Sequence, residues 1–134
     1  MRMTRRAASA VFCLVAVGPG LTACGGQPAV CDDVDALQAS IKKLEDVKVG
    51  ENALSQLQTD LAAIQSDIKQ LSKDASDQYS SQVGDVKSQA TALKSSIQAA
   101  SASPTAATLT QVRDDVKALG TSVQDLGNAV ADTC

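Results

Sequence analysis

The chain has 134 residues, with 15 acidic and 12 basic side chains, no His, and 44% hydrophobic residues. The absence of His excludes Ser-His-Asp and Cys-His catalytic arrangements and imidazole metal ligands. No GxxxxGK or GxGxxG phosphate-binding motif occurs. A chain of this length is ordinary for one domain, and we expect neither an enzyme nor a cofactor or metal site.

Residues 1–23 have the pattern of an export signal. Three arginines within the first six residues precede the apolar run 7–17, which is too short to span a bilayer as a helix. The Gly-Pro-Gly of residues 18–20 then interrupts any helix. Cleavage of an ordinary secretory signal after Ala23 would place the bulky Leu21 at position −3, where a small residue is preferred. Another kind of processing site is therefore expected here.

The tetrapeptide Leu21-Thr22-Ala23-Cys24 resembles the lipobox of bacterial lipoproteins, in which a Leu and two small residues precede a Cys. The resemblance covers residues 1–24 only. It implies that Cys24 receives a thioether-linked diacylglyceryl group and becomes the first residue after cleavage. Two acyl chains are enough for stable membrane anchoring. Paired arginines also occur in twin-arginine signals, but the hydrophobic residues that follow the pair in those signals are missing here.

Removal of residues 1–23 takes away three arginines and no acid, which leaves 111 residues with a net charge of −6. This charge argues against a nucleic-acid partner and against a second, electrostatic attachment to anionic lipid. Residues 24–30 would form a lipid-anchored tether that spans at most about 25 Å. Residues 31–134 would then form the folded domain on the extracytoplasmic side of the cell membrane.

Two cysteines are left after the signal is removed and Cys24 is acylated, namely Cys31 and Cys134. Exported proteins meet oxidising conditions, so we predict a disulfide between them, with free thiols or an intermolecular bridge as the alternatives. Closing a loop of this length removes on the order of 4 to 5 kcal/mol of denatured-state entropy. The bridge would join the two ends of the domain.

Between these cysteines the hydrophobic residues recur at alternating steps of three and four, which predicts an all-α fold with heptad seams and excludes strands. The pattern predicts helices near 32–48, 52–72, 76–101 and 104–131. The predicted core positions are Val34, Leu37, Ile41, Leu44, Leu54, Leu57, Leu61, Ile64, Ile68, Leu71, Tyr79, Val83, Val86, Ala90, Leu93, Ile97, Leu109, Val112, Val116, Leu119, Val123, Leu126 and Val130.

The helix boundaries are predicted from Gly, Pro and short polar residues. We expect Gly50 to end the first helix and Asn52 to cap the second. Ser103 is expected to cap the last helix, with Pro104 at its first position. Two interpretations of segment 72–78 remain open, since it is either a turn between two helices or a stutter within one long helix.

A turn at residues 72–78 predicts an antiparallel bundle of four helices that run up, down, up and down. A stutter predicts three helices, of which the central one, residues 52–101, would be about 75 Å long. Both arrangements bring the cysteines close together. We favour four helices because the compact bundle buries more apolar surface.

Three acidic residues crowd the start of the first helix, where negative charge meets the positive end of the helix dipole. They lack the alternating oxygen ligands and the Gly of a calcium loop. We interpret them as helix-start electrostatics rather than a metal site. These residues are Asp32, Asp33 and Asp35.

Three glycines lie beside the predicted seams of the last two helices. Gly120 and Gly127 are seven residues apart, and Gly84 would lie opposite them if the two helices fold back on each other. Close approach of the two backbones is one interpretation. A second interpretation is that the helices tolerate the glycines, each of which lowers helix stability by about 1 kcal/mol. A third is that a side chain of a partner docks against them.

Two classes of function remain open. The first is a structural or interaction lipoprotein, a scaffold, spacer or adaptor that contacts another envelope protein or a wall component. The second is a binding or sensing module for a small apolar or peptide ligand held between helices. The chain is similar to murein lipoprotein in its lipobox and heptads, but it ends in Cys134 rather than in a wall-linked Lys. It resembles small envelope lipoproteins that carry a helical hairpin or bundle.

Overall fold

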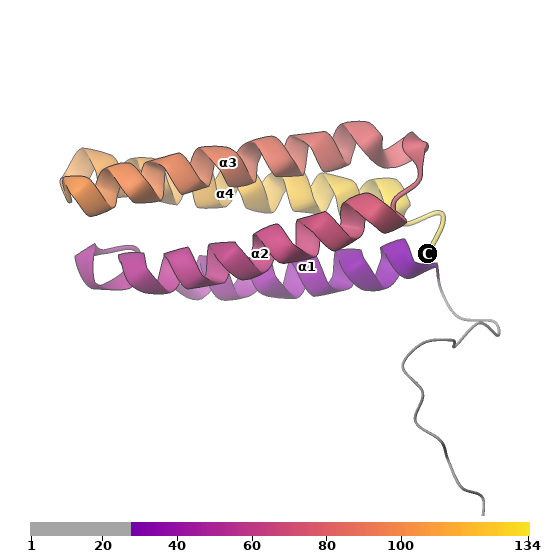
Figure 1. Cartoon of the computed structure of the whole chain (residues 1–134), viewed down its shortest axis with the longest axis horizontal. Helices are drawn as coiled ribbons and strands as arrows, with labels where there is room; N and C mark the ends of the chain where they lie inside the picture. Colours follow the sequence, from indigo (N-terminus) through magenta and orange to yellow (C-terminus); the bar gives the residue numbers. More distant parts are fainter. Residues whose placement is uncertain (1–27) are drawn as a thin grey trace, which may run out of the picture.

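The computed structural model describes residues 28–134, which form an antiparallel four-helix bundle (Figure 1). The helices run up, down, up and down, and the described part contains no strand. Short 3-10 turns precede the second and third helices. The elements are α1 Ala29–Asp46, η1 Glu51–Ala53, α2 Leu54–Asp74, η2 Asp77–Tyr79, α3 Ser80–Ala102 and α4 Ala106–Val130.

The segment 72–78 forms a turn, as favoured, and the alternative of one long helix over residues 52–101 is wrong. α2 ends at Asp74, where the backbone of Ala75 becomes extended, and the 3-10 turn η2 leads into α3. The reversal buries the apolar faces of α2 and α3 against each other and against the other two helices. The four-helix bundle is therefore confirmed.

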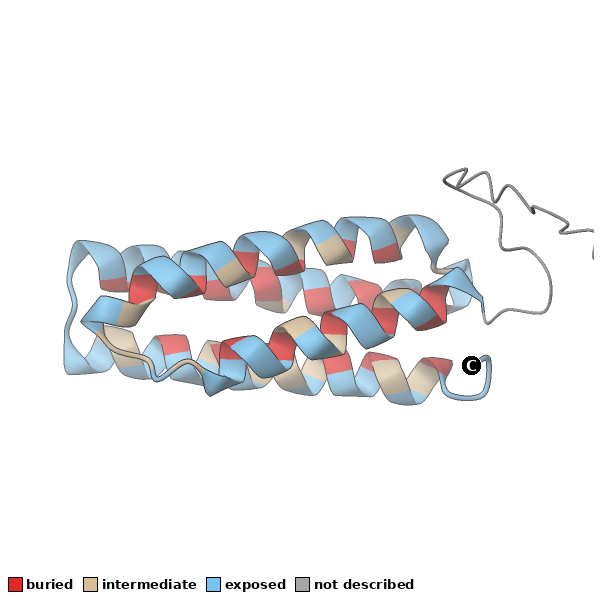
Figure 2. Ribbon diagram, turned by 90° about the horizontal axis from the view of Figure 1, so that it is seen from below, coloured by how far each residue is buried: buried red, intermediate tan, exposed pale blue. Residues whose placement is uncertain are grey.

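The core consists of the predicted heptad positions. All of them are buried except Leu109, which is half-buried. Figure 2 shows the buried residues on the inward faces of all four helices. The heptad pattern missed only a few buried side chains near the ends of helices or beside the seam, which are Val30, Cys31, Ser96 and Ala100.

The start of α1 differs from the prediction. The helix begins at Ala29, so two residues that the sequence assigns to the tether belong to the bundle. Val30 and Cys31 are 4% and 3% exposed, and their burial against the core extends the helix backward from the acidic cluster. The predicted signal segment 1–23 and Cys24 lie outside the described residues.

Two predicted helix boundaries are wrong near the first connection. α1 ends at Asp46 rather than at Gly50, whose backbone is extended at φ −167°. Asn52 lies inside η1, and α2 has no side-chain cap. The amide of Ala53 donates to the carbonyl oxygen of Gly50 at 3.0 Å instead. A 3-10 turn thus takes the place of the expected Asn cap.

The start of α4 is capped by Thr105 and not by Ser103, so Pro104 precedes the cap. The amide of Thr108 donates to Thr105 Oγ1 at 3.2 Å, and the amide of Thr105 donates to Thr108 Oγ1 at 2.9 Å. The Thr108 hydroxyl also donates to the Ser103 carbonyl at 2.8 Å. This reciprocal capping box satisfies more backbone groups than a Ser103 cap could.

None of the described helices is both long and apolar enough to cross a bilayer.

Candidate interaction surfaces

Each helix carries its core residues at heptad positions a and d, and the flanking positions e and g meet the neighbouring helices. In an antiparallel bundle e meets e and g meets g. We call the α1–α4 and α2–α3 contacts the e junctions, and the α1–α2 and α3–α4 contacts the g junctions. The e residues are Cys31, Gln38 and Glu45 on α1, Gln58, Gln65 and Ser72 on α2, Lys87, Lys94 and Ser101 on α3, and Arg113, Gly120, Gly127 and Cys134 on or just after α4. The g residues are Asp33, Ser40, Val47, Asp60, Asp67, Asp74, Gln82, Gln89, Ser96, Asp115, Ser122 and Ala129.

The predicted disulfide closes one end of the α1–α4 junction. Cys31 and Cys134 are bonded across a sequence separation of 103 residues, with 5.8 Å between their Cα atoms. The Tyr79 hydroxyl forms a hydrogen bond with Thr133 Oγ1, which fastens the chain end to the turn before α3. We call this the disulfide end of the bundle, and the opposite end the loop end.

Of the three interpretations of the glycines, the one in which they pack against one another is wrong. A Cβ added to Gly84 would meet nothing within 4 Å, so no backbone approaches it closely. Gly120 and Gly127 face α1 instead of α3, and a Cβ on either would collide with Glu45 Oε1 or Gln38 Nε2, respectively. The absence of a side chain at these e positions lets the long polar side chains of α1 lie across α4.

A surface groove runs along the α1–α4 junction beside these glycines. Its middle part has a volume of about 500 Å³ and lies over Ile41 and Val123. Polar and charged side chains form its rims, including Lys42, Glu45 and Lys117. Towards the loop end, Arg113 donates to the Val49 carbonyl at 3.0 Å and joins the two helices. The groove therefore carries both signs of charge, and its own side chains partly fill it.

The g junctions are closed by short polar contacts. Ser40 Oγ donates to Asp67 Oδ2 at 2.8 Å across α1–α2, and Ser96 Oγ donates to Asp115 Oδ2 across α3–α4. Apart from Asp74, all the g residues are half-buried or buried. The hydroxyl groups supply the donors that half-buried carboxylates need.

Asp33 and Asp74 bring two carboxyl groups together at the α1–α2 junction. Burial is the main cause that raises the pKa of Asp33 to about 6, and the hydrogen bond and negative charge of Asp74 add to the rise. Asp32 and Asp67 contribute further negative charge. Asp33 Oδ2 is buried and accepts no hydrogen bond within the described chain.

The expected helix-start electrostatics therefore does not hold for Asp33, since α2 places a second carboxyl group beside it. Asp32 does lie in the first turn of α1, as predicted. Within residues 28–134, no three His, Cys, Asp or Glu side chains are arranged so that they could hold a metal ion.

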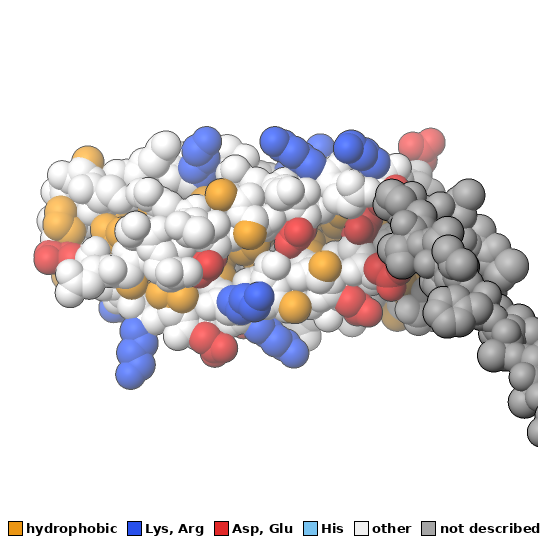
Figure 3. Space-filling model, turned by 60° about the horizontal axis from the view of Figure 1, so that its bottom comes forward, with side chains coloured by type: hydrophobic (Ala, Val, Ile, Leu, Met, Phe, Trp, Pro, Cys, Tyr) orange, Lys and Arg blue, Asp and Glu red, His pale blue; other side chains and the backbone are white. Residues whose placement is uncertain are grey.

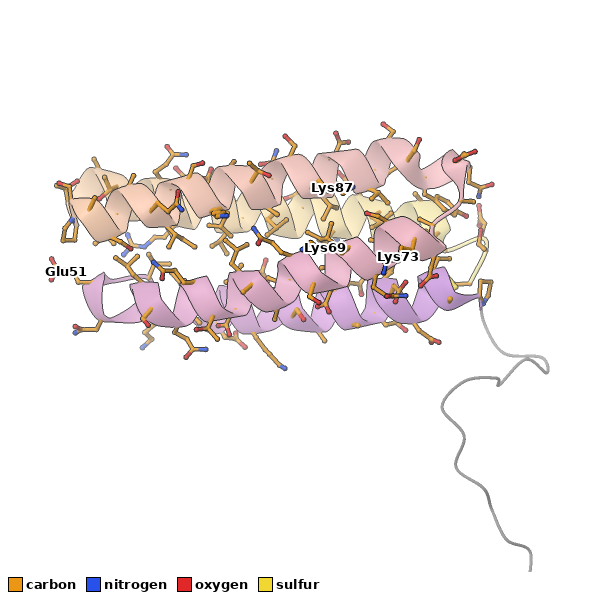
Figure 4. The ribbon with its side chains drawn as sticks, in the orientation of Figure 1. Glu51, Lys69, Lys73 and Lys87 are labelled. Atoms are coloured by element: carbon orange, nitrogen blue, oxygen red, sulfur yellow. A yellow bond between two sulfur atoms is a disulfide. The ribbon has the colours of Figure 1, made fainter. Side chains whose placement is uncertain are left out.

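The α2–α3 junction carries a groove of a different kind. Its charged rim residues are all lysines, namely Lys69, Lys87 and Lys94. Figure 4 shows Lys69 on α2 and Lys87 on α3, with Glu51 far away at the loop end. The other rim residues are uncharged amides, hydroxyls and alanines. This surface was not predicted, because the heptad positions e and b of the lysines do not by themselves say which helices become neighbours.

The chain matches no protein-family model, no curated protein and no solved structure. Any functional proposal therefore rests on the sequence motifs, the fold and these two kinds of junction. Of the predicted special residues, Cys31 and Cys134 form the predicted bond, and Cys24 lies outside the described part of the chain.

Proposed function

We propose that the protein is a membrane-anchored lipoprotein of the bacterial cell envelope whose helical bundle serves as a non-enzymatic interaction module. The observation that carries the proposal is the lipobox-like tetrapeptide ending in Cys24, directly after an export-type segment. The acyl chains on Cys24 would hold the protein on the extracytoplasmic face of the membrane.

The position of the described domain supports this arrangement. Only four residues separate Cys24 from the start of α1 at Ala29, so an anchored bundle would keep its disulfide end close to the membrane. α4 has 25 residues, which corresponds to a length of about 37 Å. The loop end would then project outward, as a spacer or adaptor requires.

The filled core favours an interaction module over a module that encloses a small apolar ligand. Twelve large side chains along the seams are less than 2% exposed and pack against one another. The grooves described above lie between neighbouring helices at the surface and have polar rims. Such surfaces suit contact with an extended partner better than enclosure of an apolar molecule.

The anchoring proposal is tested by Cys24→Ala. Cells grown with an alkyne fatty acid should label the wild-type protein and should not label the variant, which should also leave the membrane fraction. The matched control is Cys13→Ala, which removes a thiol from the preceding segment and should leave labelling unchanged. A Cys24→Ala protein that is still acylated, or still sediments with membranes, would contradict the proposal.

A further inference from the structure

The α2–α3 groove has a rim without any carboxylate, in a chain whose acids outnumber its bases. Lys69, Lys87 and Lys94 line it and are exposed to solvent. The rest of the rim consists of uncharged side chains, mainly Gln58, Gln65, Gln98 and Thr91. A surface that offers cations and hydrogen-bonding groups without a competing anion is complementary to a negatively charged ligand.

The folding of α2 separates the two signs of charge. Asp60, Asp67 and Asp74 recur every seven residues at position g and therefore face α1, where Asp67 accepts its bond from Ser40. The lysines lie on the other side of the seam. Figure 3 shows Lys and Arg side chains along the upper edge of the bundle and others along its lower part, with carboxylates spread over the face between them. The groove is thus positive although the chain as a whole is acidic.

The three lysines follow the groove at regular intervals. Gln58 Nε2 donates to Ser101 Oγ at 3.1 Å, which marks the antiparallel register of α2 and α3. In this register Lys69 lies at the level of residue 90, between Lys87 and Lys94. With a rise of 1.5 Å per residue, the cations are spaced by about 4.5 and 6 Å along the helix axis. A linear array of this kind fits an extended ligand that carries charge at repeated intervals.

The floor of the groove excludes some types of partner. Leu61, Ile68 and Ile97 form its apolar part and are only 4%, 3% and 1% exposed. A partner helix would find no apolar anchor of the kind that dominates tight protein interfaces. A membrane surface would find no aromatic or large aliphatic side chain to receive in its interfacial layer. Charge and hydrogen bonds are what the groove offers.

We propose that the α2–α3 groove binds a linear phosphodiester polymer of the cell envelope. Lysine ammonium groups bind phosphate as point charges, and glutamine amides both donate to and accept from the hydroxyls of a polyol chain between phosphates. This inference deepens the proposed function by naming a partner, and it rests on that function for the meeting of protein and polymer in the envelope.

Synthetic poly(glycerol phosphate) is the probe, titrated against the full-length chain in mild detergent by fluorescence anisotropy. Each phosphate contact with a flexible strand contributes a slope of about −0.7 to the log–log salt dependence, so three contacts predict about twentyfold weaker binding at 200 than at 50 mM salt. The triple variant K69Q/K87Q/K94Q should bind at least tenfold more weakly at 50 mM salt and should lose most of this salt dependence.

The matched control is K42Q/K48Q/K117Q, which removes the same charge from the α1–α4 side and should bind within twofold of wild type. All six lysines are exposed, so both variants should keep the wild-type helical content and melting temperature. A small-molecule control, glycerol phosphate itself, should bind far more weakly because it engages one lysine at a time.

Three results would overturn the proposal: no binding of the polymer by wild type, equal losses in the two triple variants, or equal binding of poly-glutamate. Binding of anionic vesicles through the same three lysines, without binding of the polymer, would assign the surface to the membrane instead. Purified-component binding does not depend on acylation, so a failed labelling test of Cys24 and a failed polymer test are separate outcomes.

Discussion

The two kinds of junction in this bundle differ in how far their flanking side chains are exposed to solvent. At the g junctions, nearly every flanking side chain is half-buried or buried, and hydroxyl groups bond carboxylates across the contact. At the e junctions most flanking side chains are exposed, and grooves run between the helices, with rims of both charges at α1–α4 and of lysines alone at α2–α3. Figure 1 shows α1 with α2, and α3 with α4, as two layers of the bundle.

The difference shows that one heptad repeat can build both a closed and an open side of the same bundle. The g junctions join helices within each of the two hairpins, and the e junctions join one hairpin to the other. The side chains at position g are therefore mostly covered, and more of those at position e are accessible to other molecules. The disulfide is the exception, since it closes an e junction covalently at one end.

Removal of the disulfide has the largest expected effect on this contrast. The double variant C31S/C134S should lose up to about 4 to 5 kcal/mol of unfolding free energy, because the cross-link no longer restricts the denatured chain. Urea unfolding followed by circular dichroism measures the loss. Reduced wild-type protein is the control and should lose the same amount. A loss below about 1 kcal/mol would show that the e junction holds without its covalent link.

Asp33→Asn tests the acidic contact at the α1–α2 junction and has the next largest effect. Because the pKa of Asp33 is raised to about 6, the folded state holds its proton more tightly than the unfolded chain, whose pKa is close to 3.8. The charged carboxylate therefore destabilises the fold above pH 6, and the penalty disappears as the pH falls from 6 to below 4.

The variant should be more stable than wild type by about 1 to 2 kcal/mol at pH 7.5, a value reduced for the partial solvent exposure of the site. Its advantage should vanish near pH 4. Chemical unfolding at several pH values measures the difference. Asp35→Asn, an equal charge change at an exposed position of α1, is the control. If the gain in unfolding free energy did not depend on pH, protonation of Asp33 would not be linked to folding.

Gly84→Ala and Gly120→Ala give the smallest expected effects and separate an open position from a covered one. A methyl group on Gly84 meets nothing, so the gain in helix propensity should raise stability by about 0.5 to 1 kcal/mol. At Gly120 the methyl group must displace the end of the Glu45 side chain, which should reduce the gain to about 0 to 0.5 kcal/mol. Thermal unfolding measures both, and equal gains would show that Glu45 moves without cost.

Several features of the fold could be predicted because they depend on local periodicity. The steps of three and four identify the core, and Cys31 and Cys134 pair as expected. The helix caps were predicted less well, since Asn52 and Ser103 compete with other hydrogen-bonding arrangements of the backbone. Thr105 and Thr108 satisfy each other, which a single-residue cap rule does not anticipate.

The candidate surface could not be read in the same way, because its charge depends on which helices become neighbours. The lysines of α2 and α3 are separated by up to 25 residues and form one stripe only after the turn at residues 75–79 reverses the chain. Gly120 likewise meets Glu45 of α1 rather than Gly84 of α3, since the e positions of α4 point to the first helix.

The sequence by itself determined the all-α class, the core seam and the cysteine pair. A hydrophobic period of 3.5 residues has only one regular structure that can bury it, and the two cysteines within residues 28–134 have only one pairing with each other. The tertiary structure alone decided that residues 72–78 turn, that Asp33 meets Asp74, and that three lysines share a groove without acids. These outcomes depend on the register between helices, and register follows from the packing of all four seams together.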